Sequence, residues 1–281
     1  MRNPIQATPE AKLLSPNWLS RRRLLRVMGA GLATPLLVPQ HLLAHALSGL
    51  PTLKPGVLRI GTYFDNPPFE FVSHGQRVGF EVDLMTEAAR RLDLQPEFVE
   101  TKWEGIFGEI EEQRYDCIMG GITITPRRRT LLAWSVPYMT TTLSMLVDTA
   151  RSPANMTLSD LQSGTIGVQA ATTDYDAAVS MQKDGKIGRV KVYSFARMSS
   201  AIADLTAGRI QAVMKVYPAS AWIVQHTPEL RILAQVPDDP QPLGIGFNKS
   251  NTALVAMTNR TLVRMHEDGS YRTLAKRWGL S

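Results

Sequence analysis

Short apolar runs alternate with segments of helical period in the first half of the chain. Residues 57–61 form an apolar run that ends in glycine, which predicts a strand. Apolar residues recur every four positions from Glu81 to Leu92, and acids occupy the first turn, which predicts a helix. Further strands are predicted at 97–99 and 116–119, with a helix at 106–112 between them. This alternation favours βαβ units and a mostly parallel sheet.

The same alternation restarts near residue 165 and predicts a second α/β unit. Strands are expected at 165–168, 190–193, 210–216 and 230–235, and helices at 175–182, 201–206 and 219–226. A strand at 243–247 and a long helix at 252–266 follow, and Asn251 is placed to cap that helix. The fold class is therefore α/β with two lobes.

The N-terminus has the pattern of a twin-arginine export signal. Residues 20–26 contain four arginines, an apolar stretch follows from Val27 to Val38, and Ala44-His45-Ala46 matches a small-x-small cleavage site. The apolar stretch is shorter than the roughly 20 residues that a spanning helix needs. We expect cleavage after Ala46 and a periplasmic protein; an uncleaved anchor and a basic tail with a buried helix remain alternatives.

Charge and composition narrow the function classes. The chain carries a net charge of +6, but residues 1–46 hold six basic residues and one acid, so the remainder is nearly neutral and gives no case for nucleic acid. The single cysteine, Cys117, lies in a strand-like run and is expected to be a buried thiol without a disulfide. The five histidines lack metal-ligand spacing, and no hydrolase motif occurs, so we expect neither cofactor nor metal.

A series of short motifs resembles family 3 extracellular solute-binding proteins, the amino-acid-type receptors of bacterial ABC importers. The motifs follow one another in order across 57–280, and include Pro68-Phe69-Glu70, Gly79-Phe80-Glu81-Val82-Asp83-Leu84, Trp103-Glu104-Gly105-Ile106, Gly121-Ile122-Thr123-Ile124-Thr125-Pro126, Ser135-Val136-Pro137-Tyr138, Gly167-Val168-Gln169, Gly208-Arg209-Ile210, Asp268-Gly269-Ser270 and Lys276-Arg277-Trp278-Gly279.

The resemblance implies the type II periplasmic binding-protein fold. Lobe 1 is then discontinuous, at 55–142 and 240–281, and lobe 2 is at 148–235. Crossovers near 143–147 and 236–240 form the hinge. A small ligand binds in the interlobe cleft, and closure of the hinge buries it.

The resemblance also assigns ligand-binding roles to named residues. Arg128 is expected to hold a ligand carboxylate, since a guanidinium fork matches two carboxylate oxygens; the alternative is a solvated turn, which we expect for Arg127 and Arg129. The carboxylate site is completed by Thr123, by Gly121 at a position that is often serine, and by Thr173 with Thr172 at a helix N-terminus. For the threonines the alternative is simple helix capping.

Three further residues are expected to shape specificity. Asn66 and Trp103 match cleft positions, although Trp103 fits a core position equally well, and Tyr217 is a third candidate.

One position departs from the family pattern. Val216 stands where the family has an ammonium-binding aspartate, and Lys215 precedes it. Either Asp174 replaces that acid, or the ligand is not an ordinary α-amino acid. Because side chains alternate along a strand, we expect Lys215 to face solvent, opposite Val216. If it reaches the cleft instead, a dicarboxylate or 2-oxo acid becomes plausible.

These residues predict a monomeric binding protein that delivers an amino acid or related small carboxylate to an ABC permease, after export by the twin-arginine translocase. One alternative is an enzyme like the cyclohexadienyl or arogenate dehydratases of the same fold, but the resemblance places their proton donor where this chain has Val216. Another is a sensor that presents its ligand to a membrane receptor.

Overall fold

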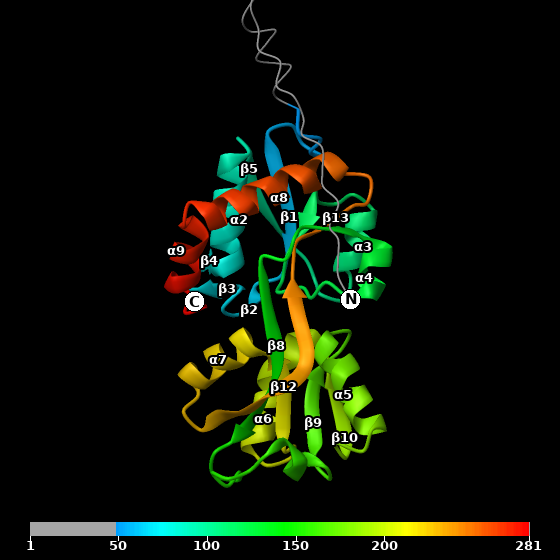
Figure 1. Ribbon diagram of the computed structural model, residues 1–281, viewed down its shortest axis with the longest axis vertical. Coiled ribbons are helices and arrows are strands. Elements are labelled where there is room, and N and C mark those ends of the chain that lie inside the picture. Colours follow the sequence, from blue (N-terminus) through cyan, green and yellow to red (C-terminus); the bar gives the residue numbers. More distant parts are fainter. Residues whose placement is uncertain (1–48, 281) are drawn as a thin grey trace, which may run out of the picture. The chain divides into compact units, whose positions relative to one another are not determined.

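The computed structural model describes residues 49–280, so the predicted export signal and its cleavage site after Ala46 lie outside the described residues. The described strands form two five-stranded sheets and one three-stranded sheet (Figure 1). None of the helices within 49–280 is long and apolar enough to cross a membrane.

The first five-stranded sheet has the order β5-β1-β6-β13-β7. Its strands are β1 (Val57–Thr62), β5 (Gln95–Glu100), β6 (Cys117–Ile118), β7 (Ala133–Trp134) and β13 (Gly246–Phe247). β1 runs parallel to β5 and β6, whereas β13 runs antiparallel to β6 and β7. The sheet is therefore mixed rather than mostly parallel, because a strand from late in the chain is inserted between β6 and β7.

Helices and a small hairpin sheet complete the part of the chain built on this first sheet. The helices are α2 (Phe80–Arg91), α3 (Ile106–Glu111), α4 (Pro126–Leu131), α8 (Thr252–Glu267) and α9 (Ser270–Arg277). Asn251 caps α8 as predicted, accepting a hydrogen bond from the backbone N–H of Leu254 at 3.2 Å. The three-stranded sheet consists of β2 (Asp65–Asn66), β3 (Glu70–Ser73) and β4 (Gln76–Val78).

The second five-stranded sheet has the order β10-β9-β11-β8-β12. Its strands are β8 (Met139–Asp148), β9 (Thr165–Gln169), β10 (Arg189–Tyr193), β11 (Ala212–Val216) and β12 (Leu230–Leu243). The helices of this part are α5 (Thr173–Lys183), α6 (Met198–Thr206) and α7 (Tyr217–His226), with short 3₁₀ turns at Leu158–Leu161 and Phe195–Arg197. β9, β10 and β11 are parallel, and β8 pairs antiparallel with β11 and β12.

Two long antiparallel strands, β8 and β12, connect the two sheets. Their pairing extends from Met139 opposite Leu243 to Asp148 opposite Leu230, with register shifts on the β12 side, the larger of them between Gln235 and Pro240. At one end, Leu243 forms a β-bridge with Thr123, and its carbonyl accepts a hydrogen bond from the Tyr138 N–H. Thr123 and Tyr138 lie in the segments that follow β6 and β7 of the first sheet. The two predicted crossover segments, 143–147 and 236–240, therefore lie within β8 and β12.

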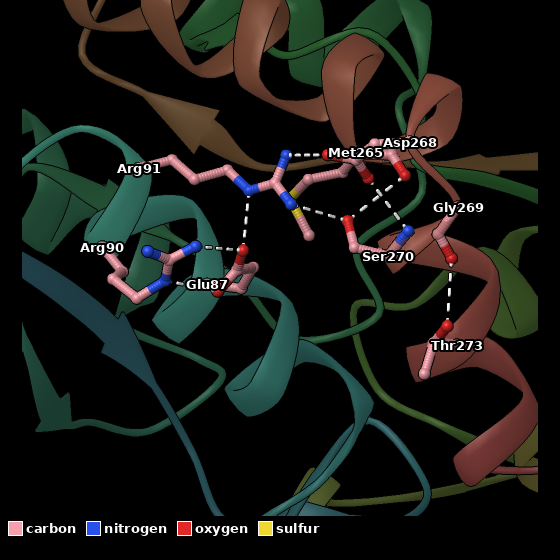
Figure 2. Close-up of polar contacts among 8 residues, drawn as sticks. All are labelled: Glu87, Arg90, Arg91, Met265, Asp268, Gly269, Ser270 and Thr273. Atoms are coloured by element: carbon pink, nitrogen blue, oxygen red, sulfur yellow. Dashed lines mark hydrogen bonds and ion pairs between the residues drawn. The ribbon is translucent and has the colours of Figure 1, made fainter.

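Polar contacts join α2 to the C-terminal helices (Figure 2). The Arg91 guanidinium donates to Glu87 Oε1 at 2.7 Å, to Asp268 Oδ2 at 2.6 Å and to Ser270 Oγ at 2.8 Å. Asp268 Oδ1 also accepts from the Ser270 N–H at 3.0 Å, where α9 begins. The Asp-Gly-Ser motif of the sequence therefore links α8, α9 and α2.

The apolar core confirms the expected environment of the cysteine. Cys117 is fully buried with Leu58, Ile60 and Phe247, which come from the same sheet. Burial raises the pKa of its thiol, so the protonated form dominates at neutral pH. The cysteine therefore packs as a small apolar residue.

Candidate functional site

One cavity is lined by residues from both parts of the described chain, the part built on the first five-stranded sheet and the part built on the second. Every site residue predicted from the sequence belongs to this lining except Tyr217. The lining consists of Tyr63, Asn66, Trp103, Gly120, Gly121, Thr123, Arg128, Thr172, Thr173, Asp174, Phe195, Lys215 and Val216. Charged, hydroxyl and aromatic side chains meet in this lining, a combination typical of sites for small polar solutes.

The Arg128 guanidinium is held in place by backbone carbonyls and aromatic rings. Thr125 caps α4 and accepts from the Arg128 N–H at 3.1 Å, which fixes the start of the side chain. Nη1 donates to the carbonyl of Thr123 at 2.9 Å, and Nη2 donates to that of Ala171 at 3.3 Å. The carbon Cζ lies 5.3 Å from the ring centres of both Trp103 and Phe107. Burial lowers the pKa of this group, yet it stays protonated at neutral pH.

Arg127 and Arg129 are exposed, as we expected for them.

Aromatic rings form one wall of the cavity. Trp103 stacks on Phe195 with ring centres 5.2 Å apart, and Tyr63 meets Phe195 edge to face at 4.6 Å. Trp103 is thus both a core residue and a lining residue. Its indole Nε1 is buried and has no hydrogen-bond partner among the described residues. An unpaired buried donor is costly, so an acceptor from a bound solute would be favourable there.

Three threonines line the cavity: Thr123, from the part built on the first sheet, and Thr172 and Thr173, from the start of α5 in the second part. Thr172 caps α5, accepting from the Tyr175 N–H at 3.2 Å, and its hydroxyl donates to the carbonyl of Gln169 at 2.7 Å. Thr173 is the first residue of α5, whose first-turn N–H groups have no intrahelical acceptors. Its hydroxyl lies 3.4 Å from the hydroxyl of Thr123. Thr172 therefore has the capping role and also lines the cavity.

A pair of buried acids lies beneath Asn66 and Gly121. Asn66 Nδ2 donates to Glu70 Oε1 at 2.9 Å, and the Gly121 N–H donates to Glu81 Oε2 at 2.9 Å. Glu81 Oε1 also accepts from the Tyr138 hydroxyl at 2.6 Å. Burial, together with the nearby charge of Glu81, holds the pKa of Glu70 well above its ordinary value. The protonated form of the Glu70 carboxyl is therefore favoured.

Lys215 lines the cavity, so our expectation that it faces solvent was wrong. Its exposure is 6%, and its Nζ donates to Gln169 Oε1 at 2.5 Å. Burial lowers its pKa, while the charge of Asp174 raises it. Lys215 does not face solvent because all five residues of the central strand β11 are buried, and both it and Val216, the residue before α7, belong to the lining.

Asp174 is the one carboxylate among the lining residues. It is 3% exposed, and burial raises its pKa to about 6, against the opposing charges of Lys215 and Arg128. Tyr217, by contrast, is 38% exposed and lies outside the lining.

Sequence reasoning missed Tyr63, Gly120 and Phe195 as lining residues. Tyr63 directly follows β1, so its place at the carboxyl end of a parallel strand was an available signal. Phe195 lies in a short 3₁₀ turn that shows no periodicity. Residues 49–280 contain no group of three or more histidine, cysteine or acidic side chains that could hold a metal ion.

The cavity lining includes the hydrogen-bond donors Arg128, Lys215 and the three threonines. The cavity has the chemistry of a binding site for a polar, acceptor-rich solute.

Comparison with known proteins places this cavity in context. Residues 58–281 match the family described as "Bacterial extracellular solute-binding proteins, family 3". The L-cystine-binding protein TcyJ of Escherichia coli (strain K12) is 25% identical over 261 residues, which cover 92% of this chain and 96% of TcyJ.

Two solved structures show the same fold. An ancestral arginine-binding protein bound to arginine has a TM-score of 0.72 and 29% identity, and the alignment covers 79% of this chain and 98% of that one. The ancestral amino acid-binding protein AncCDT-1, a precursor of cyclohexadienyl dehydratase, has a TM-score of 0.71 and 30% identity, covering 79% and 95%. These matches confirm the predicted two-lobed fold class, and the proteins matched are binding proteins rather than enzymes.

Proposed function

The chain belongs to the bacterial extracellular solute-binding proteins of family 3, and we propose that it captures an amino acid or a closely related small carboxylate for an ABC permease. The solute binds in the cavity between the two sheets. Arg128 holds a carboxylate, with Thr123 and Thr173 beside it. No bond of the solute is made or broken.

The observation that carries this proposal is the state of Arg128. Its guanidinium is positioned by two carbonyl oxygens, yet no carboxylate among residues 49–280 lies within ion-pair distance of it. Arg128 is partly buried, and a partly buried cation without a counter-ion is unfavourable, so a bound carboxylate that supplies one is favoured. The first-turn N–H groups of α5 add a favourable dipole at the same place.

The strands β8 and β12 are the proposed hinge. Lobe 1 comprises 55–142 and 240–281, and lobe 2 comprises 148–235. The register shift of β12 between Gln235 and Pro240 supports this assignment, because a break in pairing eases bending. The contacts from Arg128 to Ala171 and from Thr123 to Thr173 cross the cavity, as expected of a closed form.

Export and delivery complete the proposal. The arginine-rich segment at 20–26 directs the chain to the twin-arginine translocase, cleavage follows Ala46, and the periplasmic monomer docks on its permease. The relatives of the family are extracellular binding proteins, which supports a location outside the cytoplasm.

Titration calorimetry on an Arg128→Ala variant tests the site. We expect the affinity for an amino acid or dicarboxylate that binds the wild type to fall by at least about 2 kcal/mol, because one member of a buried charge pair is removed. Arg129→Ala, at an exposed position of the same helix, is the matched control and keeps full affinity. Equal affinities of the wild type and Arg128→Ala would contradict the assignment.

A further inference from the structure

Lys215 is a buried cation with an incomplete set of hydrogen-bond partners. Its Nζ donates to Gln169 Oε1, and no second acceptor or carboxylate within residues 49–280 lies in bonding range of it. An ammonium group carries three N–H donors. The ring of Phe195, whose centre lies 5.8 Å from Nζ, covers part of the group without accepting a conventional hydrogen bond. The protein thus leaves donor capacity of Lys215 available inside the cavity.

The charges of the lining do not balance. Arg128 and Lys215 are cations, and Asp174 is the one acid that the lining contains. Two more acids, Glu70 and Asp65, act on Lys215 from outside the lining. Burial and the charge of Glu81 raise the pKa of Glu70, and Asp65 is exposed to solvent. The lining itself therefore offers two basic side chains and one carboxylate.

We propose that the solute carries two carboxylates, one held by Arg128 and the other by Lys215. This inference rests on the proposed function, since it assumes that the cavity is the solute site. It adds a chemical class, because an ordinary neutral amino acid has only one anionic group. A solute with two carboxylates and one ammonium gives Arg128 and Lys215 one carboxylate each and places its ammonium beside Asp174.

Other lining groups favour an anionic solute. Val216 offers no counter-charge to a ligand cation. A solute with a basic side chain would bring another cation towards Lys215, and like charges in a dry cavity repel strongly.

Glutamate and glutamine form a matched pair for testing this inference, since they have the same shape and differ in one charge. We expect calorimetry to show that glutamate, or a dicarboxylate of two to five carbons, binds the wild type at least about tenfold more tightly than its amide analogue. In Lys215→Met this preference disappears, while the affinity for the amide analogue changes less than about threefold. Lys215→Arg keeps the charge and keeps the preference.

Lys186→Met is the control, because Lys186 is exposed and outside this cavity. It retains the wild-type preference. If Lys215 has only a structural role, Lys215→Met lowers the affinities for the acid and for its amide analogue by the same factor, which overturns the inference. Should Lys215→Met fail to fold, the wild-type comparison decides alone: equal affinity for glutamate and glutamine, or a preference for basic amino acids, overturns the inference.

The two proposals fail in different ways. If glutamine binds, depends on Arg128 and is not surpassed by glutamate, the proposed function stands and the dicarboxylate inference is wrong. If no carboxylate in the panel binds, or if Arg128→Ala binds as the wild type does, the proposed function itself is wrong and the inference falls with it.

Discussion

At the scale of single residues, Asp174 has the most telling environment. It lies at the start of α5, is almost wholly buried and lines the same cavity as Arg128 and Lys215. Burial is the largest influence on its carboxyl group and raises its pKa from 3.8 to about 6, despite the two nearby cations. The Asp174 carboxyl therefore keeps its proton to a higher pH than an ordinary aspartate, and a cationic group of a solute would favour its ionised form.

This raised pKa predicts how stability changes with pH. Between about pH 4 and pH 6 the folded protein keeps a proton on Asp174 that the unfolded chain has released, so this group's stabilising contribution is lost as the pH rises through that window. The shift from 3.8 to about 6 corresponds to roughly 3 kcal/mol. Urea unfolding of the solute-free protein should show Asp174→Asn gaining stability relative to the wild type across this window. Parallel curves for the two proteins would refute the environment described for Asp174.

The sequence alone could suggest Asp174 and Lys215 but could not place Lys215. Lys215 and Val216 are both paired with β8 inside β11, so their side chains alternate as expected. However, β11 is a central strand whose five residues are all buried, so the face opposite Val216 is covered rather than exposed to solvent. Arg128, Thr123 and Thr173 were predictable because their motifs are local and each precedes or opens a helix.

At the scale of elements, α2 joins the cavity to the C-terminus. Its first turn holds Glu81, which binds the Gly121 N–H beneath the cavity, and Asp83, which accepts from Trp278 Nε1 at 2.9 Å. Its last turn holds Arg91, which contacts Asp268 and Ser270. Motifs that are far apart in the sequence therefore contact one another around one helix.

Arg91 is expected to contribute to stability through these contacts. Its side chain is 20% exposed and makes hydrogen bonds to three residues, so Arg91→Met should lower the free energy of unfolding by about 1–2 kcal/mol. Arg90→Met is the control: its side chain is 69% exposed and contacts Glu87 alone among these residues, so a much smaller loss is expected. Equal losses in urea unfolding would show that the links to α8 and α9 do not stabilise the fold.

Most helices and the strands β1, β5, β9, β10 and β11 were predictable from apolar periodicity, but the long strand β8, the second half of β12, the β3–β4 hairpin and helix α4 were not. The hairpin formed by β3 and β4 is short and largely polar, so its alternation is weak. Helix α4 contains three consecutive arginines and no buried residue, and only its Thr125 cap and Pro126 indicate a start. The insertion of β13 between β6 and β7 is a long-range pairing, which local patterns do not encode.

At the scale of the whole molecule, aromatic contacts join the two halves away from the cavity lining. Trp222 on α7 lies with its ring centre 5.1 Å from that of Phe71 on β3 and 6.4 Å from that of Trp278. His226 stacks on the other side of Trp222 at 4.3 Å. Opening of the proposed hinge would separate Trp222 from Phe71 and Trp278.

Trp222 should therefore influence affinity without touching the solute. Trp222→Ala destabilises the closed form, and we expect solute affinity to fall about fivefold, mainly through faster dissociation in stopped-flow measurements. Trp222→Phe keeps a ring against Phe71 and should retain most of the affinity. An unchanged dissociation rate in Trp222→Ala would mean that this contact does not take part in closure.

The most direct test of the central claim is a crystal structure with a bound dicarboxylate or amino acid. The account predicts one carboxylate within about 3 Å of the Arg128 guanidinium, beside Thr123 and Thr173. It also predicts the second acidic group of the solute at Lys215. A solute bound elsewhere, or bound in the cavity with its carboxylate turned away from Arg128, would contradict the account.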